Sequence, residues 1–303
     1  MTIWGKRAQA LAAAAGAVLM AASPAWAATA AANLFYQRSV MAAADRACKL
    51  FEPPVSSALT AAKLQARGAA LRSGMDAASL KALETQASAA ALGAGCRSPD
   101  ITVAAQQVKK AFDGYAQLSK MRYPGETTDW VAERTIDDRR AHWRLSQRVR
   151  IGWDTMVFGI VGNGQARPLM AVASFADGAE PYAARLILRD ASSTSGPYLA
   201  RNEADIRGRI PLDGRLPPRS ASVVFTAEAM SPAGGDLRPA DLATGWAFRF
   251  PDQAQAALAE LDPREAVAVE FLFAGDREDE ARTAYVEVGD FAAGRAFETL
   301  AQR

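Results

Sequence analysis

The chain has 303 residues, with 35 basic and 33 acidic side chains, one histidine and two cysteines. Two of the basic residues and none of the acidic ones lie in the first 27 positions, so the other residues, about 276, carry balanced charge. A chain with balanced charge lacks the net positive potential that would attract nucleic acids or anionic membrane surfaces, so we expect neither as a partner. This length is enough for one large domain or two ordinary ones, and we expect two.

The first 27 residues have the pattern of a secretory signal peptide. Lys6 and Arg7 precede an apolar run from Ala8 to Ala22, which is too short for a stable membrane anchor, and Ala25-Trp26-Ala27 is a small-x-small cleavage site. No cysteine follows that site as a lipid attachment point, and no later apolar run approaches the length of about 20 residues that a membrane helix needs. We therefore expect a soluble periplasmic or secreted protein without a transmembrane segment in its mature part.

The only two cysteines, Cys48 and Cys96, both follow the expected cleavage site. In an oxidising compartment such a pair is most simply a disulfide, with two free thiols as the alternative. A metal or catalytic role is disfavoured because there is no Cys-x-x-Cys motif and the only histidine, His142, is distant in sequence. In the chain-entropy model, a bridge across a loop of this size stabilises a fold by about 4 kcal/mol.

The first half of the sequence predicts four helices, because it is rich in good helix formers and its apolar residues recur at spacings of three and four. Capping residues and helix breakers set the ends of these helices. The expected helices run from Asn33 to Phe51, from Val55 to Arg72, from the cap Asp76 to Gly93, and from the cap Ser98 to about Leu118. Short connections favour an antiparallel bundle. The disulfide would then join the first helix to the turn before the fourth.

After Tyr123-Pro124-Gly125 the apolar pattern changes to a period of two, which is typical of strands. Gly162-Asn163-Gly164 suits a hairpin turn between two of them. The strand candidates are His142 to Ile151, Met156 to Val161, Leu169 to Phe175, Tyr182 to Arg189, Ala221 to Ala229, Trp246 to Phe250, Ala266 to Phe273 and Thr283 to Val288. Seven or eight short strands with turns between them favour an antiparallel sandwich or barrel.

Two short helices interrupt the strands, one from Asp252 to Leu261 and a terminal one capped by Asp290. Between residues 190 and 220 a Gly/Pro/Ser/Arg-rich stretch resembles a long loop, and function and disorder are both open for it. We predict an α+β fold, with an N-terminal region like a four-helix bundle, then an antiparallel β-sandwich with a C-terminal helix. The expected division is a signal peptide at 1–27, a helical domain at 28–122, a linker at 123–140 and a β-sandwich domain at 141–303.

The end of the sequence carries a family resemblance. Ala266-Val-Ala-Val-Glu-Phe-Leu-Phe, followed by Tyr285-Val-Glu-Val-Gly-Asp-Phe-Ala-Ala-Gly-Arg-Ala-Phe, is similar to the last strands and closing helix of the invasion-associated locus B family. The chain as a whole resembles secreted alphaproteobacterial proteins of unknown function. The resemblance implies a β-sandwich in the cell envelope. The β half lacks the cysteines of that family, so no site residue is transferred.

Basic residues on the predicted strands are the one feature that indicates a partner. Alternation places Arg144, Arg148 and Arg150 on one face of a strand, and Arg185 and Arg189 would join them if their strand lies in the same sheet. Arginine presents fixed donors that suit carboxylate and phosphate groups. We therefore expect an anionic envelope component, or an envelope protein, as the partner. The alternative is that these arginines pair with acids on neighbouring strands.

Other candidate side chains have a structural interpretation that we favour. Tryptophans could stack sugars or bases but more often belong to a core. They are Trp130, Trp143, Trp153 and Trp246. An acidic run could bind Ca²⁺ but is more simply a solvated loop tip. It consists of Asp276, Glu278, Asp279 and Glu280. His142 lies on the polar face of a predicted strand, which favours a solvated residue over a catalytic one.

The sequence contains no motif that names a chemistry. A single histidine excludes the His-Glu-x-x-His zinc site, and the sequence has no Gly-x-Ser-x-Gly elbow and no P-loop. We therefore expect a binding or interaction module of the envelope, without a cofactor or metal ion, in preference to an enzyme. The alternative is an envelope glycan hydrolase that uses a pair of carboxylates.

Overall fold

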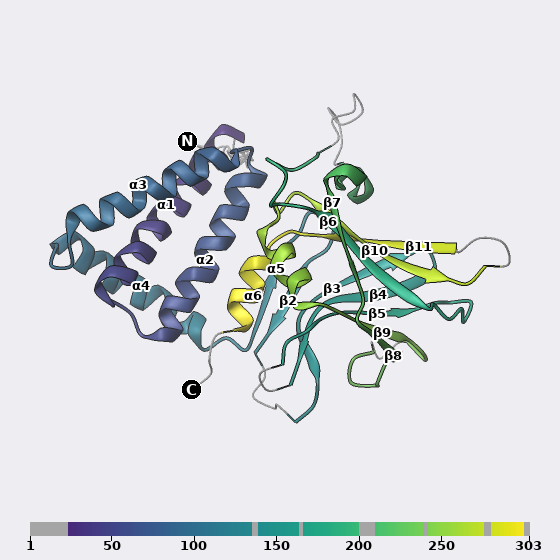
Figure 1. Cartoon of the computed structure of the whole chain (residues 1–303). Coiled ribbons are helices and arrows are strands. Elements are labelled where there is room, and N and C mark those ends of the chain that lie inside the picture. Colours follow the sequence, from purple (N-terminus) through teal and green to yellow (C-terminus); the bar gives the residue numbers. More distant parts are fainter. Residues whose placement is uncertain are drawn as a thin grey trace, which may run out of the picture.

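The computed structural model describes residues 24–134, 139–163, 166–199, 210–238, 242–275 and 280–299. Within these ranges, four helices form one half, antiparallel sheets of seven and four strands form the other, and a C-terminal helix lies between the halves (Figure 1). The predicted α+β fold with a sandwich-like β half is therefore confirmed. The expected signal peptide lies outside the described residues up to position 23.

The helical half begins with a helix that is longer than expected. Its helices are α1 (Pro24–Cys48), α2 (Pro53–Arg72), α3 (Ala77–Ala94) and α4 (Pro99–Ala116). Asn33 lies inside α1 and does not cap it, because the residues before Asn33 are mostly alanine, the strongest helix former. Asp76 caps α3 by accepting a hydrogen bond from the Ser79 amide at 2.7 Å, whereas the side chain of Ser98 makes no capping bond to α4. No helix in the described ranges is both long and apolar enough to cross a membrane.

The core of the bundle is divided into small clusters in which alanine is the commonest residue. Their buried members are Phe35, Ala66, Ala70, Leu71 and Leu80; Ala43, Ala44, Ala91 and Ile101; and Met41, Leu59 and Ala105. The predicted disulfide between Cys48 and Cys96 is present, with the two Cα atoms 5.5 Å apart. It joins the end of α1 to the turn before α4.

The larger sheet has the strand order β1-β2-β3-β4-β5-β9-β8, and every neighbouring pair is antiparallel. Its strands are β1 (Lys120–Tyr123), β2 (Trp130–Glu133), β3 (His142–Ile151), β4 (Asp154–Gly162), β5 (Leu169–Ser174), β8 (Ala229–Pro232) and β9 (Trp246–Phe250). All nine residues of β4 are buried, because it is a central strand with both faces covered. The predicted hairpin between β4 and β5 is formed by antiparallel pairing, and its turn residues 164–165 lie outside the described chain.

The smaller sheet has the order β11-β10-β6-β7. Its strands are β6 (Ala183–Arg189), β7 (Ser222–Thr226), β10 (Ala266–Phe273) and β11 (Glu280–Glu287). Side chains from both sheets meet in one continuous core, in which phenylalanine rings contact one another edge to face (for example Phe175 with Phe273, ring centres 4.9 Å apart). Residues 200–209 of the long stretch between β6 and β7 lie outside the described chain.

Three strands were not predicted: β1, β2 and β8. Each has four residues, which is too short for a clear alternation, and pairing with neighbouring strands decides their conformation. β2 lies within the segment expected to be a linker, and its Trp130 is fully buried in the sandwich core. The expected linker at 123–140 is therefore wrong in this respect, because the β half already begins at Lys120.

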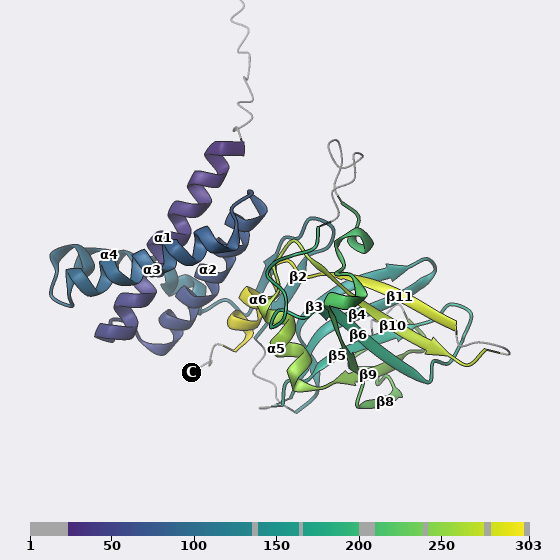
Figure 2. The same cartoon turned by 45° about the horizontal axis from the view of Figure 1, so that its top comes forward.

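The last helix connects the two halves of the molecule. α5 (Asp252–Glu260) covers one end of the sandwich, while α6 (Phe291–Glu298) packs between α2 and strands β2 and β3. Figure 2 shows α6 between the bundle and the sheets from a second direction. Asp290 precedes α6 but makes no capping bond, because its buried carboxylate forms an ion pair with Arg72 of α2, at 2.9 and 3.2 Å. Burial raises the pKa of Asp290 above its ordinary value, and Arg72 opposes this effect.

Aromatic and charged groups complete the contact around α6. The guanidinium of Arg134 lies 3.6 Å from the centre of the Phe297 ring, a cation–π contact, and the hydroxyls of Tyr115 and Tyr123 are 3.1 Å apart. Ala58 and Ala61 of α2 belong to the same continuous core as the sandwich. The bundle therefore covers an apolar surface of the β half at α6.

Candidate functional site

The five arginines singled out in the sequence lie in two different sheets. Arg144, Arg148 and Arg150 are on β3 of the larger sheet, and Arg185 and Arg189 are on β6 of the smaller one. The condition for a common basic face, one shared sheet, is not met. The five arginines therefore do not form the single basic face that was predicted.

Arg185 and Arg189 form ion pairs within the protein. Arg185 contacts Glu270 of β10 at 2.9 Å, and these two residues are direct cross-strand neighbours. Arg189 is buried and makes a bidentate contact with Glu265, at 2.6 and 3.0 Å. The structure therefore supports the alternative interpretation for these two residues: each pairs with an acid on the neighbouring strand β10 or at its end.

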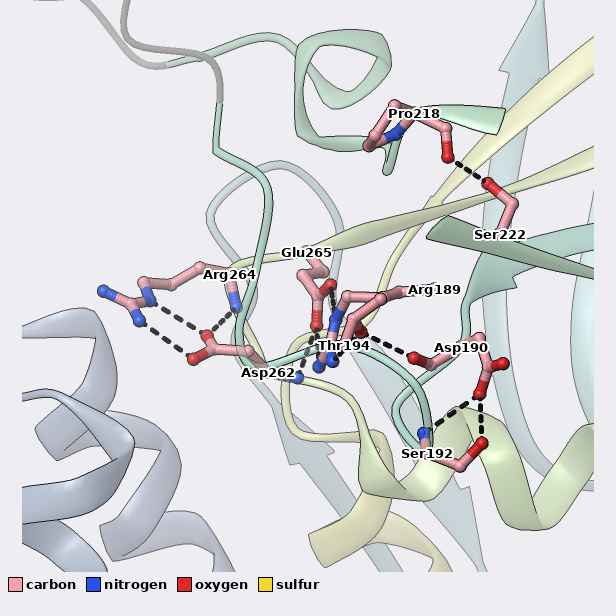
Figure 3. A network of polar contacts seen from close by, with 9 residues as sticks. All are labelled: Arg189, Asp190, Ser192, Thr194, Pro218, Ser222, Asp262, Arg264 and Glu265. Atoms are coloured by element: carbon pink, nitrogen blue, oxygen red, sulfur yellow. Dashed lines mark hydrogen bonds and ion pairs between the residues drawn. The ribbon is translucent and has the colours of Figure 1, made fainter. Parts of the chain in front are cut away.

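Figure 3 shows that Arg189 belongs to a network of polar contacts at the ends of β6 and β10. The carboxylate of Glu265 also accepts a hydrogen bond from the Asp262 amide at 2.8 Å, and Arg189 donates a further bond to the Thr194 hydroxyl at 3.0 Å. Asp190 accepts hydrogen bonds from the amide and hydroxyl of Ser192, which contribute to lowering its pKa. The network fixes the chain after β6, so these polar groups have a structural task.

Arg144 is buried, with an exposed fraction of 3 %. A β-bulge lies between Trp143 and Leu145, so the alternation of β3 breaks there and Arg144 and Leu145 are both buried. Gly159 lies opposite the bulge with φ of +150°, and a Cβ there would overlap the Leu145 carbonyl oxygen. Burial raises the pKa of Glu298 in α6, and the positive charges of Arg167 and Arg144 oppose this rise. Arg144 therefore does not belong to the exposed face of β3.

Arg148 and Arg150 remain, and both are exposed on β3. They line a groove of about 830 Å³, in the range of ligand pockets. The other lining residues come from β3 itself and from three further segments far apart in the sequence. They are Thr127 and Thr128, Val149, the turn Pro211 to Asp213, and Thr283 and Tyr285 of β11. Two guanidinium groups and several hydroxyls, against one carboxylate among these lining residues, make the groove suited to an anionic group.

One wall of the groove is held by a buried carboxylate. Glu287, at the end of β11, is fully buried and accepts hydrogen bonds from the amides of Glu126, Thr127 and Thr128, at 2.7, 2.8 and 3.3 Å. Three amide donors directed at one carboxylate satisfy a charge that would otherwise be costly to bury. The position of residues 126–128 is thus fixed by a residue about 160 positions later in the chain.

A second segment that lines the groove, residues 211–213, is linked to the first one. The side chain of Glu126 forms an ion pair at 2.8 Å with Arg215, which belongs to the short helix η2 (Leu212–Arg215). Arg215 is buried, and it also donates a hydrogen bond to the Ile210 carbonyl at 2.8 Å. A continuous set of contacts therefore leads from Glu287 through Glu126 to η2. The groove is preorganised, which reduces the entropy lost when a ligand binds.

A buried side chain that does not itself line the groove bridges the two sheets. Gln147 of β3 accepts a hydrogen bond from the Glu287 amide at 2.9 Å and donates to the Glu287 carbonyl at 3.2 Å. Trp130 donates from its indole nitrogen to the carbonyls of Glu287 and Val288, both at 3.0 Å. Sequence reasoning missed Glu287 and Gln147, because nothing in a single sequence distinguishes them from exposed polar residues of alternating strands.

The other candidate residues have separate positions. Trp130 is buried, Trp143 and Trp246 are half-buried, and Trp153 is 94 % exposed in the turn between β3 and β4. His142 is half-buried at the start of β3. Of the acidic run, only Glu280 lies within the described residues, where it is exposed. Across those residues no group of three or more His, Cys, Asp or Glu side chains could hold a metal ion.

Comparison of the chain with family models, with curated proteins and with solved structures gives no match in any of the three.

Proposed function

We propose that this protein is an envelope binding module, periplasmic or secreted, that holds an anionic group of its ligand in the groove between β3, β11 and η2. The observation that carries the proposal is the pair Arg148 and Arg150, both exposed on one face of β3 inside the groove. Residues two apart on a strand lie about 6.6 Å apart, which suits two charges on neighbouring units of a polymer. The secretory pattern of the first 27 residues and the disulfide support the location.

The chemistry of the groove favours carboxylate or phosphate ligands. Arginine can donate two parallel hydrogen bonds to either group, and the hydroxyls of Thr127, Thr128 and Tyr285 can donate to the remaining oxygens. Both groups are plentiful in peptidoglycan and in outer-membrane lipid. Binding should weaken with salt, because exposed charges are screened over about 10 Å at 0.1 M ionic strength.

No observation favours the hydrolase. A carboxylate pair needs one acid whose pKa is raised so that it can donate a proton. The described carboxyls with a raised pKa are Asp290 and Glu298, and both form ion pairs around α6 away from the groove. Asp213 is the only carboxylate among the described lining residues. The binding proposal therefore stands alone.

Sedimentation with isolated envelope fractions tests the proposal. Arg148→Ser combined with Arg150→Ser should weaken the affinity by about tenfold or more, because two charge-assisted contacts are lost. The fraction of protein that sediments with the envelope should fall accordingly. The matched control is Arg97→Ser with Arg249→Ser, which removes the same charge from exposed positions outside the groove, one in the turn before α4 and one on β9. Equal sedimentation of the groove variant and the control would remove the groove from consideration.

A further inference from the structure

A second groove lies in the helical half, between α1 and α4, and has a volume of about 560 Å³. It exists because α1 packs closely on α2 and α3, and α4 packs mainly on α2, so that α1 and α4 approach each other only loosely. Apolar side chains form most of its surface. They include Leu34, Val40 and Met41 of α1, Leu59 of α2, and Val108 and Phe112 of α4.

The floor of this groove is part of the bundle core. Met41 and Leu59 are buried, and together with Ala105 they form one of the three small clusters, against which Val108 and Phe112 pack. Leu34, at one end, is 40 % exposed. The groove is thus an open apolar channel that reaches the surface, long enough along α1 to follow two turns of helix.

One positive charge lies in this apolar groove. The side chain of Arg38 is half-buried and lines it, and Nη1 of Arg38 donates a hydrogen bond to the Ala62 carbonyl at 2.6 Å. No carboxylate among the residues that the structure describes forms an ion pair with Arg38. Burial lowers the pKa of Arg38, the Tyr115 phenol opposes this, and no carboxylate contributes. Arginine stays protonated nonetheless, and four of its five N–H donors are left for other partners.

We infer that this groove binds an anionic amphiphile with a single hydrocarbon chain, whose headgroup pairs with Arg38 and whose chain lies along Met41, Leu59 and Val108. A partly buried cation without an acidic partner is unfavourable, and a bound carboxylate or phosphate compensates for it. The apolar walls remove the chain from water, and the volume lies within the usual range of about 300–1,000 Å³ for ligand pockets. This site is separate from the groove at Arg148 and does not depend on the proposed function.

The test is a calorimetric titration of the purified protein with dodecanoate, below the concentration at which dodecanoate forms micelles. We expect saturable binding that weakens about fourfold for each methylene removed from the chain. Dodecyl phosphate separates a carboxylate from a phosphate preference, since either anion should bind. Dodecyltrimethylammonium has the same chain with a positive headgroup, and it should bind at least about tenfold more weakly than the anions.

Two variants locate the site. Arg38→Met should weaken dodecanoate binding by about tenfold or more while dodecanol binding is unchanged, and Arg97→Met is the charge-matched control outside the groove. Ala104→Leu narrows the groove and should weaken binding of the acid and the alcohol alike, without a change of charge.

The proposal is overturned if dodecanoate does not bind to the folded native chain, or if the cationic and anionic amphiphiles bind equally. It is also overturned if neither Arg38→Met nor Ala104→Leu changes the affinity. If Arg38→Met does not fold, the comparison of headgroups on the native chain and the Ala104→Leu variant still decide the question.

Discussion

The helical half and the β half of this protein are stabilised in different ways. In the bundle the buried residues form three small clusters dominated by alanine, whereas the sandwich holds one continuous core with contacting phenylalanine rings. A buried aromatic side chain removes about 150–250 Å² from water, and alanine far less. The bundle adds a disulfide and an ion-paired contact with α6. A half with a thin apolar core therefore depends on cross-links and on its neighbour.

The largest effect is expected from the sandwich core. Trp130→Ala should lower the free energy of unfolding by about 3–5 kcal/mol, because a fully buried ring is lost and the carbonyls of Glu287 and Val288 lose the hydrogen bond from its indole nitrogen. Chemical denaturation measures this. Trp153→Ala is the control, since Trp153 is 94 % exposed and its loss should cost no more than about 0.5 kcal/mol. Similar losses for both would contradict a core centred on Trp130.

The next effect concerns the bundle. Replacing Cys48 and Cys96 together by alanine should cost about 2–5 kcal/mol, with the loss concentrated in the helical signal of circular dichroism. Because the sandwich core does not include the bridge, its near-ultraviolet signal should persist to higher denaturant concentration. A single transition that is unchanged from the native chain would show that the bundle does not need the cross-link.

A smaller effect tests the contact between the halves. Gly68 of α2 faces α6, and a Cβ at this position would be 2.6 Å from Oδ1 of Asp290. Gly68→Ala should therefore destabilise by about 1–3 kcal/mol, although the same exchange inside a helix normally stabilises. Gly114→Ala in α4 meets nothing within 4 Å, so it should stabilise by up to about 1 kcal/mol. If thermal unfolding showed that both substitutions change the stability in the same direction, this would argue against close packing of α2 on α6.

The smallest effects are pH dependences of opposite sign. The pKa of Asp290 is raised by burial at the contact between the halves, so its folded carboxyl binds a proton more readily than the unfolded one. Its contribution to stability is therefore largest below the ordinary aspartate pKa and is lost as the pH rises through the folded value. Compared with Asp290→Asn, the native chain should gain stability as the pH falls from neutral.

Asp177, at the other end of the sandwich, behaves in the opposite way. Its hydrogen bonds with Arg282 lower its pKa to about 2, so its contribution is present above the ordinary aspartate pKa and is lost as the pH falls through about 2. Compared with Asp177→Asn, the native chain should lose stability in acid. Parallel pH profiles of unfolding for the Asp290 and Asp177 variants would contradict the two assigned environments.

Several elements were predictable to the residue because their information is local. The strands His142–Ile151, Trp246–Phe250 and Ala266–Phe273 follow from alternation or an apolar run, and the cap at Asp76 follows from residue type. β2 was missed because four residues carry too little pattern, and its conformation depends on pairing with β3. Long-range pairing is not encoded in a short segment.

The candidate site was predictable only in part, for the same reason. Arg148 and Arg150 lie on an exposed face as alternation indicates, but the bulge that buries Arg144 depends on Gly159 of the neighbouring strand. Whether Arg185 joins them depends on sheet topology, which places it in the other sheet. The walls of the groove come together through the ion pair of Glu126 with Arg215, residues that are 89 positions apart.

The proposed binding groove is tested most directly by amide chemical-shift mapping during titration with a soluble acidic fragment of envelope glycan. The largest shifts should occur at residues 127–128, 148–150 and 211–213, and they should shrink as salt is raised from about 0.05 M to about 0.5 M, because exposed charges are then screened over a few ångströms. Arg148→Ser with Arg150→Ser should abolish them. Shifts that are confined to other surfaces, or that persist unchanged in this variant, would contradict the proposed function.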